Sequence, residues 1–175
     1  MTLRVRSSAK VDGPVDLPAV PGFIESTFNP LVHHVATNCL AGQDIPGDRL
    51  AVVLGSLVGD CTTTDLASRL LVQGQVHNAL LFMQATANAV LGYLSREFDI
   101  TGPLLALSTM DGMDDELLDT AELLLADPGL DAVLVLGVEL VPTERAAHAL
   151  SLLPATAPRH DLAIALLLER HPEEP

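Results

Sequence analysis

Four short, predominantly apolar runs constrain the fold of this chain more than any other feature of its sequence. They cover residues 50–57, 104–109, 131–141 and 162–168, and turn-forming residues bound them. A short apolar run of this kind is typical of a strand that is buried on both faces of a sheet. Segments with helical spacing separate the runs, and this alternation predicts an α/β fold with a mostly parallel sheet and helices on both faces.

The helices expected between these strands differ in their sequence signals. Asn29 is a suitable N-cap for a helix that ends near residue 40, and the threonines at 62–64 offer caps for the next helix. A long apolar segment, 79–98, predicts a helix inside the protein. Further helices are expected at 114–126 and 142–152.

Proline and glycine are frequent at the start of the sequence, which predicts an extended arm with one short strand near residues 3–5. The sequence therefore divides into an N-terminal arm (1–28), one α/β domain (29–170) and a polar tail (171–175).

The charge of the chain excludes several classes of partner. Nine Lys and Arg residues stand against 23 Asp and Glu residues, a formal net charge of −14. Such a chain repels the nucleic-acid backbone and anionic membranes, so we expect neither nucleic acid nor membrane as a partner. No signal-peptide core follows the basic residues near the N-terminus, and Cys39 and Cys61 lack metal-ligand spacing. These features predict a cytoplasmic protein without a metal, and the absence of a phosphate-loop motif predicts no nucleotide cofactor.

Four motifs carry a family resemblance. They are Asn-Ala-Val-Leu-Gly at 88–92, Thr-Gly-Pro at 101–103, Leu-Ser-Thr-Met-Asp-Gly at 107–112 and Asp-Ala-Val-Leu-Val-Leu-Gly-Val-Glu at 131–139. In this order and spacing they resemble the N-terminal half of the β-ketoacyl synthases, members of the thiolase-like superfamily. The resemblance extends more weakly over residues 50–168. It implies one three-layer half of a thiolase-like fold.

The departures from the family pattern bear on activity. The resemblance places the family's nucleophilic cysteine at Asp111, preceded by Met110 where a small residue is usual. A carboxylate is a much poorer acyl acceptor than a thiolate at a helix N-terminus. The family's catalytic histidines come from a second half that would follow residue 169, and the six histidines here lie outside the family's catalytic motifs. We therefore expect no independent condensing activity.

The resemblance implies a catalytically inactive subunit comparable to a chain-length factor. Such a subunit would associate with itself or with a full ketosynthase in polyketide or fatty-acid biosynthesis. Two surfaces are expected to carry this association. One is the apolar helix at 79–98, and the other is the strand that pairs across the dimer axis in the family. That strand corresponds here to Leu104, Leu105, Ala106, Leu107, Ser108 and Thr109.

Acyl carrier proteins are typically acidic, and a partner with a charge of −14 would repel them. Direct docking would need a local basic patch, for which Arg69, Arg96 and Arg145 are the few candidates. We therefore expect an acyl carrier protein to dock on a companion subunit and to interact with this chain only indirectly.

Other interpretations remain open for single residues. Asp111 could act as a general base in a small hydrolase, isomerase or decarboxylase of acyl thioesters. The acids at 111, 114, 115, 116 and 119 could form an acid/base or metal cluster, but acids are common in a first helical turn because they complement the helix dipole, which favours a structural role. His33 and His34 point to different helix faces, which favours one core and one surface histidine.

Two further sites have a structural interpretation beside a chemical one. His77-Asn78 favours a helix cap over a partner contact. Cys61, near a strand end, favours a structural cysteine over a nucleophile.

Overall fold

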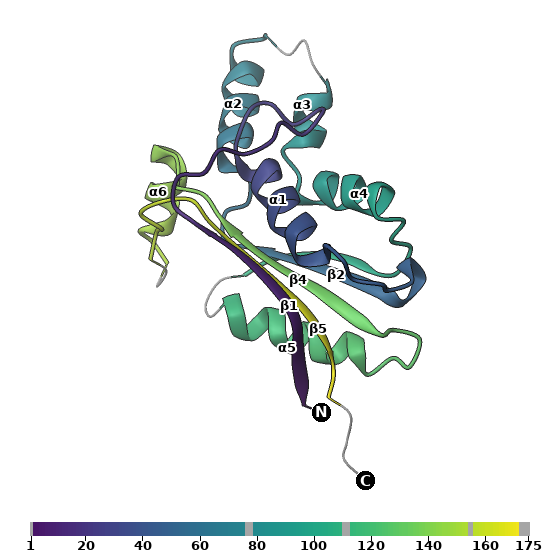
Figure 1. Ribbon diagram of the computed structural model, residues 1–175. Helices are drawn as coiled ribbons and strands as arrows, with labels where there is room; N and C mark the ends of the chain where they lie inside the picture. Colours follow the sequence, from purple (N-terminus) through teal and green to yellow (C-terminus); the bar gives the residue numbers. More distant parts are fainter. Residues whose placement is uncertain (1, 76–78, 110–112, 154–155, 172–175) are drawn as a thin grey trace.

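A five-stranded sheet organises the chain (Figure 1). The computed structural model describes residues 2–75, 79–109, 113–153 and 156–171. Its strands are β1 (Leu3–Asp12), β2 (Leu50–Ser56), β3 (Leu104–Ser108), β4 (Ala132–Glu139) and β5 (Leu162–Arg170). Its helices are α1 (Phe28–Leu40), α2 (Cys61–Val72), α3 (Ala79–Gln84), α4 (Ala87–Glu97), α5 (Met113–Leu125) and α6 (Glu144–Leu150), and a 3₁₀ turn occupies Gly47–Arg49.

The strand order is β1-β5-β4-β2-β3. β2 pairs in parallel with both β3 and β4, whereas β5 is antiparallel to β1 and to β4. Four of the five strands therefore run in one direction, and β5 is the exception. This confirms the predicted α/β fold with a mostly parallel sheet.

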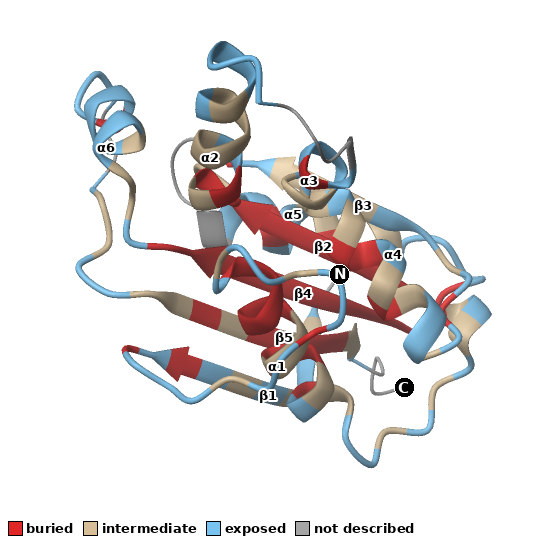
Figure 2. Cartoon of the chain, turned by 90° about the horizontal axis from the view of Figure 1, so that it is seen from above, coloured by how far each residue is buried: buried red, intermediate tan, exposed pale blue. Residues whose placement is uncertain are grey.

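Helices cover both faces of the sheet and complete three layers. On one face, α1 and α4 pack over a large apolar cluster that includes Phe28, Leu31 and Leu94. On the other face, α5 lies over β2 and β4 and buries Leu117 and Leu125 against them (Figure 1). The two central strands, β2 and β4, are buried along their whole length because they have helices on both sides (Figure 2).

The two edges of the sheet differ in character. β1 continues to Asp12, well beyond the short strand predicted near residues 3–5, and it pairs with β5 throughout. It carries Arg4, Arg6 and Lys10, and its register is irregular between Val5 and Ser7. β3, at the opposite edge, has five residues and no charge.

The prediction of one long buried helix at 79–98 is wrong. The helix is interrupted at Ala85 and Thr86, where Thr86 has an extended backbone and its Oγ1 donates to the carbonyl of Met83 at 2.8 Å. α3 packs on α2 and leaves Phe82 75% exposed, whereas α4 buries Val90, Leu91 and Leu94. Among the helices of the described segments, none combines the length and the apolar character needed to cross a bilayer.

Two predicted helix caps are also wrong. α1 begins at Phe28, so Asn29 lies inside its first turn, where it is buried. α2 begins at Cys61 and is capped by Asp60, whose Oδ1 accepts the N–H of Thr63 at 3.0 Å. Aspartate is at least as effective an N-cap as threonine, so Asp60 caps the helix and the threonines lie in its first turn.

Candidate functional site

Polar side chains gather where the parallel strands end. Ser56 ends β2, Ser108 ends β3 and Glu139 ends β4, while Thr109 and Asp60 follow in the adjoining loops. Because ligands bind at the carboxyl ends of the strands in open α/β sheets, this end of the sheet is the candidate site.

Glu139 is one of two buried acids at this site, the other being Asp60. Its side chain is 9% exposed, and its Oε1 accepts the backbone N–H of Leu57 at 2.5 Å. Ser56 Oγ donates to Oε2 at 3.4 Å. Burial raises the pKa of Glu139, and these hydrogen bonds offset part of that effect. The carboxyl group therefore keeps its proton to a higher pH than an exposed glutamate does.

This raised pKa leads to an expected dependence of stability on pH. The unfolded chain releases the Glu139 proton near the ordinary pKa of 4.5, whereas the folded chain retains it, so stability falls as pH rises above 4.5 through the folded pKa. Glu139→Gln keeps an oxygen for the Leu57 N–H but does not titrate. We expect the variant to melt at a higher temperature than the wild type at pH 8 and at a similar temperature at pH 4.

Thermal melts of both proteins from pH 4 to pH 8 would measure this difference. Glu116→Gln is the matched control, because Glu116 is exposed on α5. Parallel pH profiles for the wild type and Glu139→Gln would contradict the burial of an ionisable carboxyl group at this position.

A second buried network fixes the loop after β2. Asp60 is buried, and its Oδ2 accepts Asn29 Nδ2 at 3.3 Å, which links the start of α2 to α1. Within the described segments, Asn29 Oδ1 and Thr109 Oγ1 are buried without a hydrogen-bond partner. Both lie near the strand ends, so the site holds polar groups that its own side chains do not fully satisfy.

A cavity of about 270 Å³ opens at the carboxyl ends of β2 and β3. Ser56, Gly59 and Ser108 line it together with Ala87 at the start of α4. It falls just below the usual size of a small-molecule pocket. Its two hydroxyl groups could donate to a ligand, but none of the lining residues is a base that could activate them.

The cysteines are not activated either. Cys39 and Cys61 are both free and buried. Burial raises the pKa of each thiol, and nearby Asp60 and Asp65 add to the effect at Cys61. A protonated thiol is a poor nucleophile, so these cysteines are inert packing residues.

Part of the predicted site falls on undescribed positions. Asp111 and Met110 lie outside the described residues, between the end of β3 and the start of α5, and so do His77 and Asn78. Of the predicted acid cluster, Asp115, Glu116 and Asp119 line up along the exposed side of α5. In the part of the chain that the structure describes, no three His, Cys, Asp or Glu residues are placed to hold a metal ion.

The prediction of one core and one surface histidine is wrong. His33 and His34 are both half-buried. His33 Nε2 lies 2.7 Å from Glu97 Oε2, whereas His34 Nε2 lies 3.0 Å from Asn38 Nδ2. The two rings thus have separate partners.

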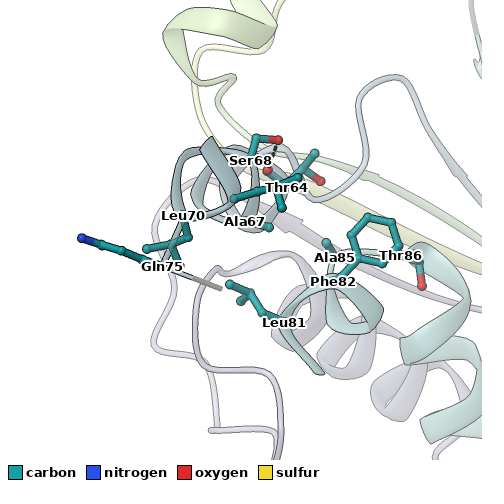
Figure 3. Close-up of a pocket in the computed structure, with 10 residues that line it drawn as sticks. Thr64, Ala67, Ser68, Leu70, Gln75, Leu81, Phe82, Ala85 and Thr86 are labelled. Carbon is teal, nitrogen blue, oxygen red and sulfur yellow. Dashed lines mark hydrogen bonds between the residues drawn. The ribbon is translucent and has the colours of Figure 1, made fainter. Parts of the chain in front are cut away.

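An exposed apolar surface is the other notable feature. It consists of the end of α2 and the outer side of α3, and its most exposed large residues are Leu71, Val72, Leu80, Phe82 and Met83. We call it the α2–α3 surface. A groove of about 540 Å³ runs between the two helices, with Leu70 on α2 and with Leu81 and Phe82 on α3 (Figure 3).

Few sequence features indicated that these polar residues would lie together. Ser56 and Glu139 are separated by 83 positions, and nothing local links them. For Glu139 there were two signals: the resemblance placed it at a strand end, and a lone acid that ends an apolar strand requires hydrogen-bond partners when it is buried.

Comparisons with known proteins were made at three levels. No protein-family model matches the sequence, and no curated protein is similar to it. Solved structures do match, with 160 similar chains.

Three of these structures define the likeness. A chain in the complex of the ketosynthase ApeO with its chain length factor ApeC from Xenorhabdus doucetiae aligns with a TM-score of 0.73 and 18% identity, over 98% of this chain and 80% of that chain. The ishigamide ketosynthase/chain length factor aligns with a TM-score of 0.67 and 20% identity, over 93% of this chain and 54% of that one. A β-ketoacyl synthase from Burkholderia phymatum aligns with a TM-score of 0.67 and 18% identity, over 92% of this chain and 46% of that chain.

These identities are low, so the likeness concerns the fold. The chain spans about half the length of the second and third of these relatives. Its sheet and helices thus correspond to part of a ketosynthase, which confirms the resemblance that the motifs at 88–139 indicated. The chain therefore has a ketosynthase-like fold of the thiolase-like type.

Proposed function

We propose that this chain is a non-condensing, ketosynthase-like subunit that binds a ketosynthase, as a chain-length factor does, in polyketide or fatty-acid biosynthesis. The observation that carries the proposal is the uncharged edge strand β3, which lies near the exposed apolar α2–α3 surface. Each part of this observation favours a protein partner.

The edge strand β3 is open to pairing. The N–H of Thr109 bonds to Ser56 and the carbonyl of Pro103 bonds to Val52, so the alternate residues of β3 face β2. The backbone groups of Ala106 therefore point away from the sheet. Edge strands are usually protected by charges, bulges or prolines, and β1 has both charges and an irregular register. β3 has no charge, and Leu104 is 37% exposed.

The α2–α3 surface lies close to this edge. α3 contacts α2 and α4, and α4 contacts β3, so one continuous side of the molecule carries both features (Figure 2). A cluster of exposed large apolar side chains is typical of a protein interface. Strand pairing and apolar burial together would give the partner both register and affinity.

The absence of a condensing nucleophile supports the proposed role. The position that the resemblance gives to the catalytic cysteine holds Asp111. Neither cysteine of the chain is exposed, and burial raises the pKa of both. The condensing chemistry would then belong to the partner, and an acyl carrier protein would reach the complex through that partner.

The kind of complex in which one matched chain occurs also supports it. The chain matched in the Xenorhabdus doucetiae structure is covered to 80%. That complex joins a ketosynthase to its chain length factor.

Co-expression with each full-length ketosynthase of the source genome, followed by size-exclusion chromatography with light scattering, tests the proposal. We expect one ketosynthase to form a stable complex of defined stoichiometry. A protein that stays monomeric, or that pairs only with itself, would contradict it.

A variant of the α2–α3 surface should separate binding from folding. Phe82→Asp places a charge on a side chain that is 75% exposed, so the chain should still fold while its affinity for the ketosynthase falls about tenfold or more. Leu123→Asp is the matched control, because Leu123 is 74% exposed on α5, across the sheet. Affinity measured by biolayer interferometry should be unchanged in the control.

A further inference from the structure

A polar cleft of about 530 Å³ lies between α2 and α6, and it shares no lining residue with the cavity beside Ser56 and Ser108. Arg69 lines it from the last turn of α2, and Arg145 and His148 line it from α6. The hydroxyl groups of Thr62 and Thr143 complete its polar lining, together with the acids Asp65 and Glu144. The structure thus brings together two of the three arginines that were candidates for a basic patch, while Arg96 lies on α4.

Unpaired cations are scarce in this chain, which has nine Lys and Arg residues in all. Most of those on or beside the sheet interact with other groups of the chain. Arg4 and Lys10 pair with carboxylates, Arg49 pairs with Asp131, and Arg170 donates to backbone carbonyls. The guanidinium group of Arg69 makes neither an ion pair nor a hydrogen bond with the described residues, although its backbone carbonyl accepts the N–H of Gln73. An arginine without a carboxylate partner can bind an anionic ligand, even in a chain as acidic as this one.

The arrangement around Asp65 keeps the second arginine available. Thr143 Oγ1 donates to Asp65 Oδ2, and Arg145 Nε lies 3.4 Å from Asp65 Oδ1. The Arg145 guanidinium makes no hydrogen bond to any described residue, so its N–H groups can donate to a ligand. Asp65 therefore orients Arg145 across the cleft toward α2, where Arg145 and Arg69 also line a second, smaller hollow together.

We propose that this cleft binds a phosphate-type oxyanion, held between the guanidinium groups of Arg69 and Arg145 and by the N–H of His148. A planar guanidinium donates two parallel hydrogen bonds to phosphate, and two such groups on facing helices give a fork that a single surface arginine lacks. Glu144 and Arg145 are both exposed, so water and salt screen the charges of both side chains, and the binding should be strongest at low ionic strength. The oxyanion could be the free ion or a phosphate group on a larger molecule.

Titration of the purified chain with inorganic phosphate at low ionic strength tests this proposal. The arginine Nε–H signals in nitrogen-15 correlation spectra report binding at each side chain. We expect saturable shifts of the Arg69 and Arg145 signals, with the Arg96 signal unchanged. Arg69→Ala and Arg145→Ala should each weaken binding about tenfold, and Arg69→Lys should weaken it less.

Arg96→Ala is the matched control, because Arg96 is also exposed and lies on a different helix. Thermal melts check that every variant is folded. A parallel titration with glycerol phosphate separates the sources: tighter binding of the ester indicates a phosphate group on a larger molecule, and equal or weaker binding indicates the free ion. Shifts that do not saturate, or equal affinity in the wild type and in Arg69→Ala and Arg145→Ala, would overturn the proposal.

Discussion

Ala106→Pro should lower the affinity for the ketosynthase partner about 100-fold, which corresponds to roughly 2.7 kcal/mol. Proline removes the one N–H that Ala106 presents at the free edge of β3, and its ring obstructs an approaching strand. The pairing of β3 with β2 uses the alternate residues, so the sheet itself should survive. Leu105, before the new proline, is already extended, as such a residue must be.

Ala106→Ser is the control for this experiment, since serine keeps the N–H and is nearly as small. Circular dichroism and thermal melts of both variants separate a folding defect from a binding defect. If Ala106→Pro folds and still binds the ketosynthase with wild-type affinity, then β3 is not the docking edge. The α2–α3 surface alone would then have to account for any complex.

The central part of the fold could be predicted because its strands are buried on both faces. β2 and β4 are continuous apolar runs, and the structure begins and ends them within two residues of the predicted bounds. α5 lies where its first-turn acids and its apolar spacing indicated, between β3 and β4. In these elements, local sequence preference and tertiary packing favour the same structure.

The edges and the surface helices were predicted less well. β1 alternates charged and apolar residues over part of its length, and it becomes a strand through pairing with β5, whose residues are at least 150 positions away. The interruption between α3 and α4 contains neither glycine nor proline. Packing explains it, because α3 follows α2 while α4 follows the sheet, and the apolar pattern continues through both helices.

The polar site could not be assembled from the sequence for a related reason. Asn29, Asp60 and Glu139 come from three different elements, and hydrogen bonds between distant segments hold each of them. A motif search finds spacing along the chain, whereas these contacts depend on strand order. The family resemblance did place Glu139 at a strand end, and the structure supplies its partners Leu57 and Ser56.

Gly102→Ala should be strongly destabilising, because residue 102 lies against the backbone of β2 just before β3 begins. A Cβ atom at residue 102 would lie 2.2 Å from the backbone oxygen of Leu50, and a backbone atom cannot rotate away as a side chain can. The N–H of Gly102 also donates to the carbonyl of Gly47 at 3.0 Å, and this hydrogen bond fixes the turn that precedes β3. The variant must therefore move the start of β3 away from β2.

We expect this displacement to cost about 3 kcal/mol of unfolding free energy and to lower the melting temperature by roughly 6 to 12 °C. Gly92→Ala is the matched control, because a Cβ at that position in α4 meets no atom within 4 Å. The control should gain about 0.5 to 1 kcal/mol from the better helix propensity of alanine. If Gly102→Ala has the same melting temperature as the wild type, then the close approach between residue 102 and β2 is not present in solution. If it melts early, its affinity for the ketosynthase should fall as well, because the strand that it displaces is the proposed docking edge.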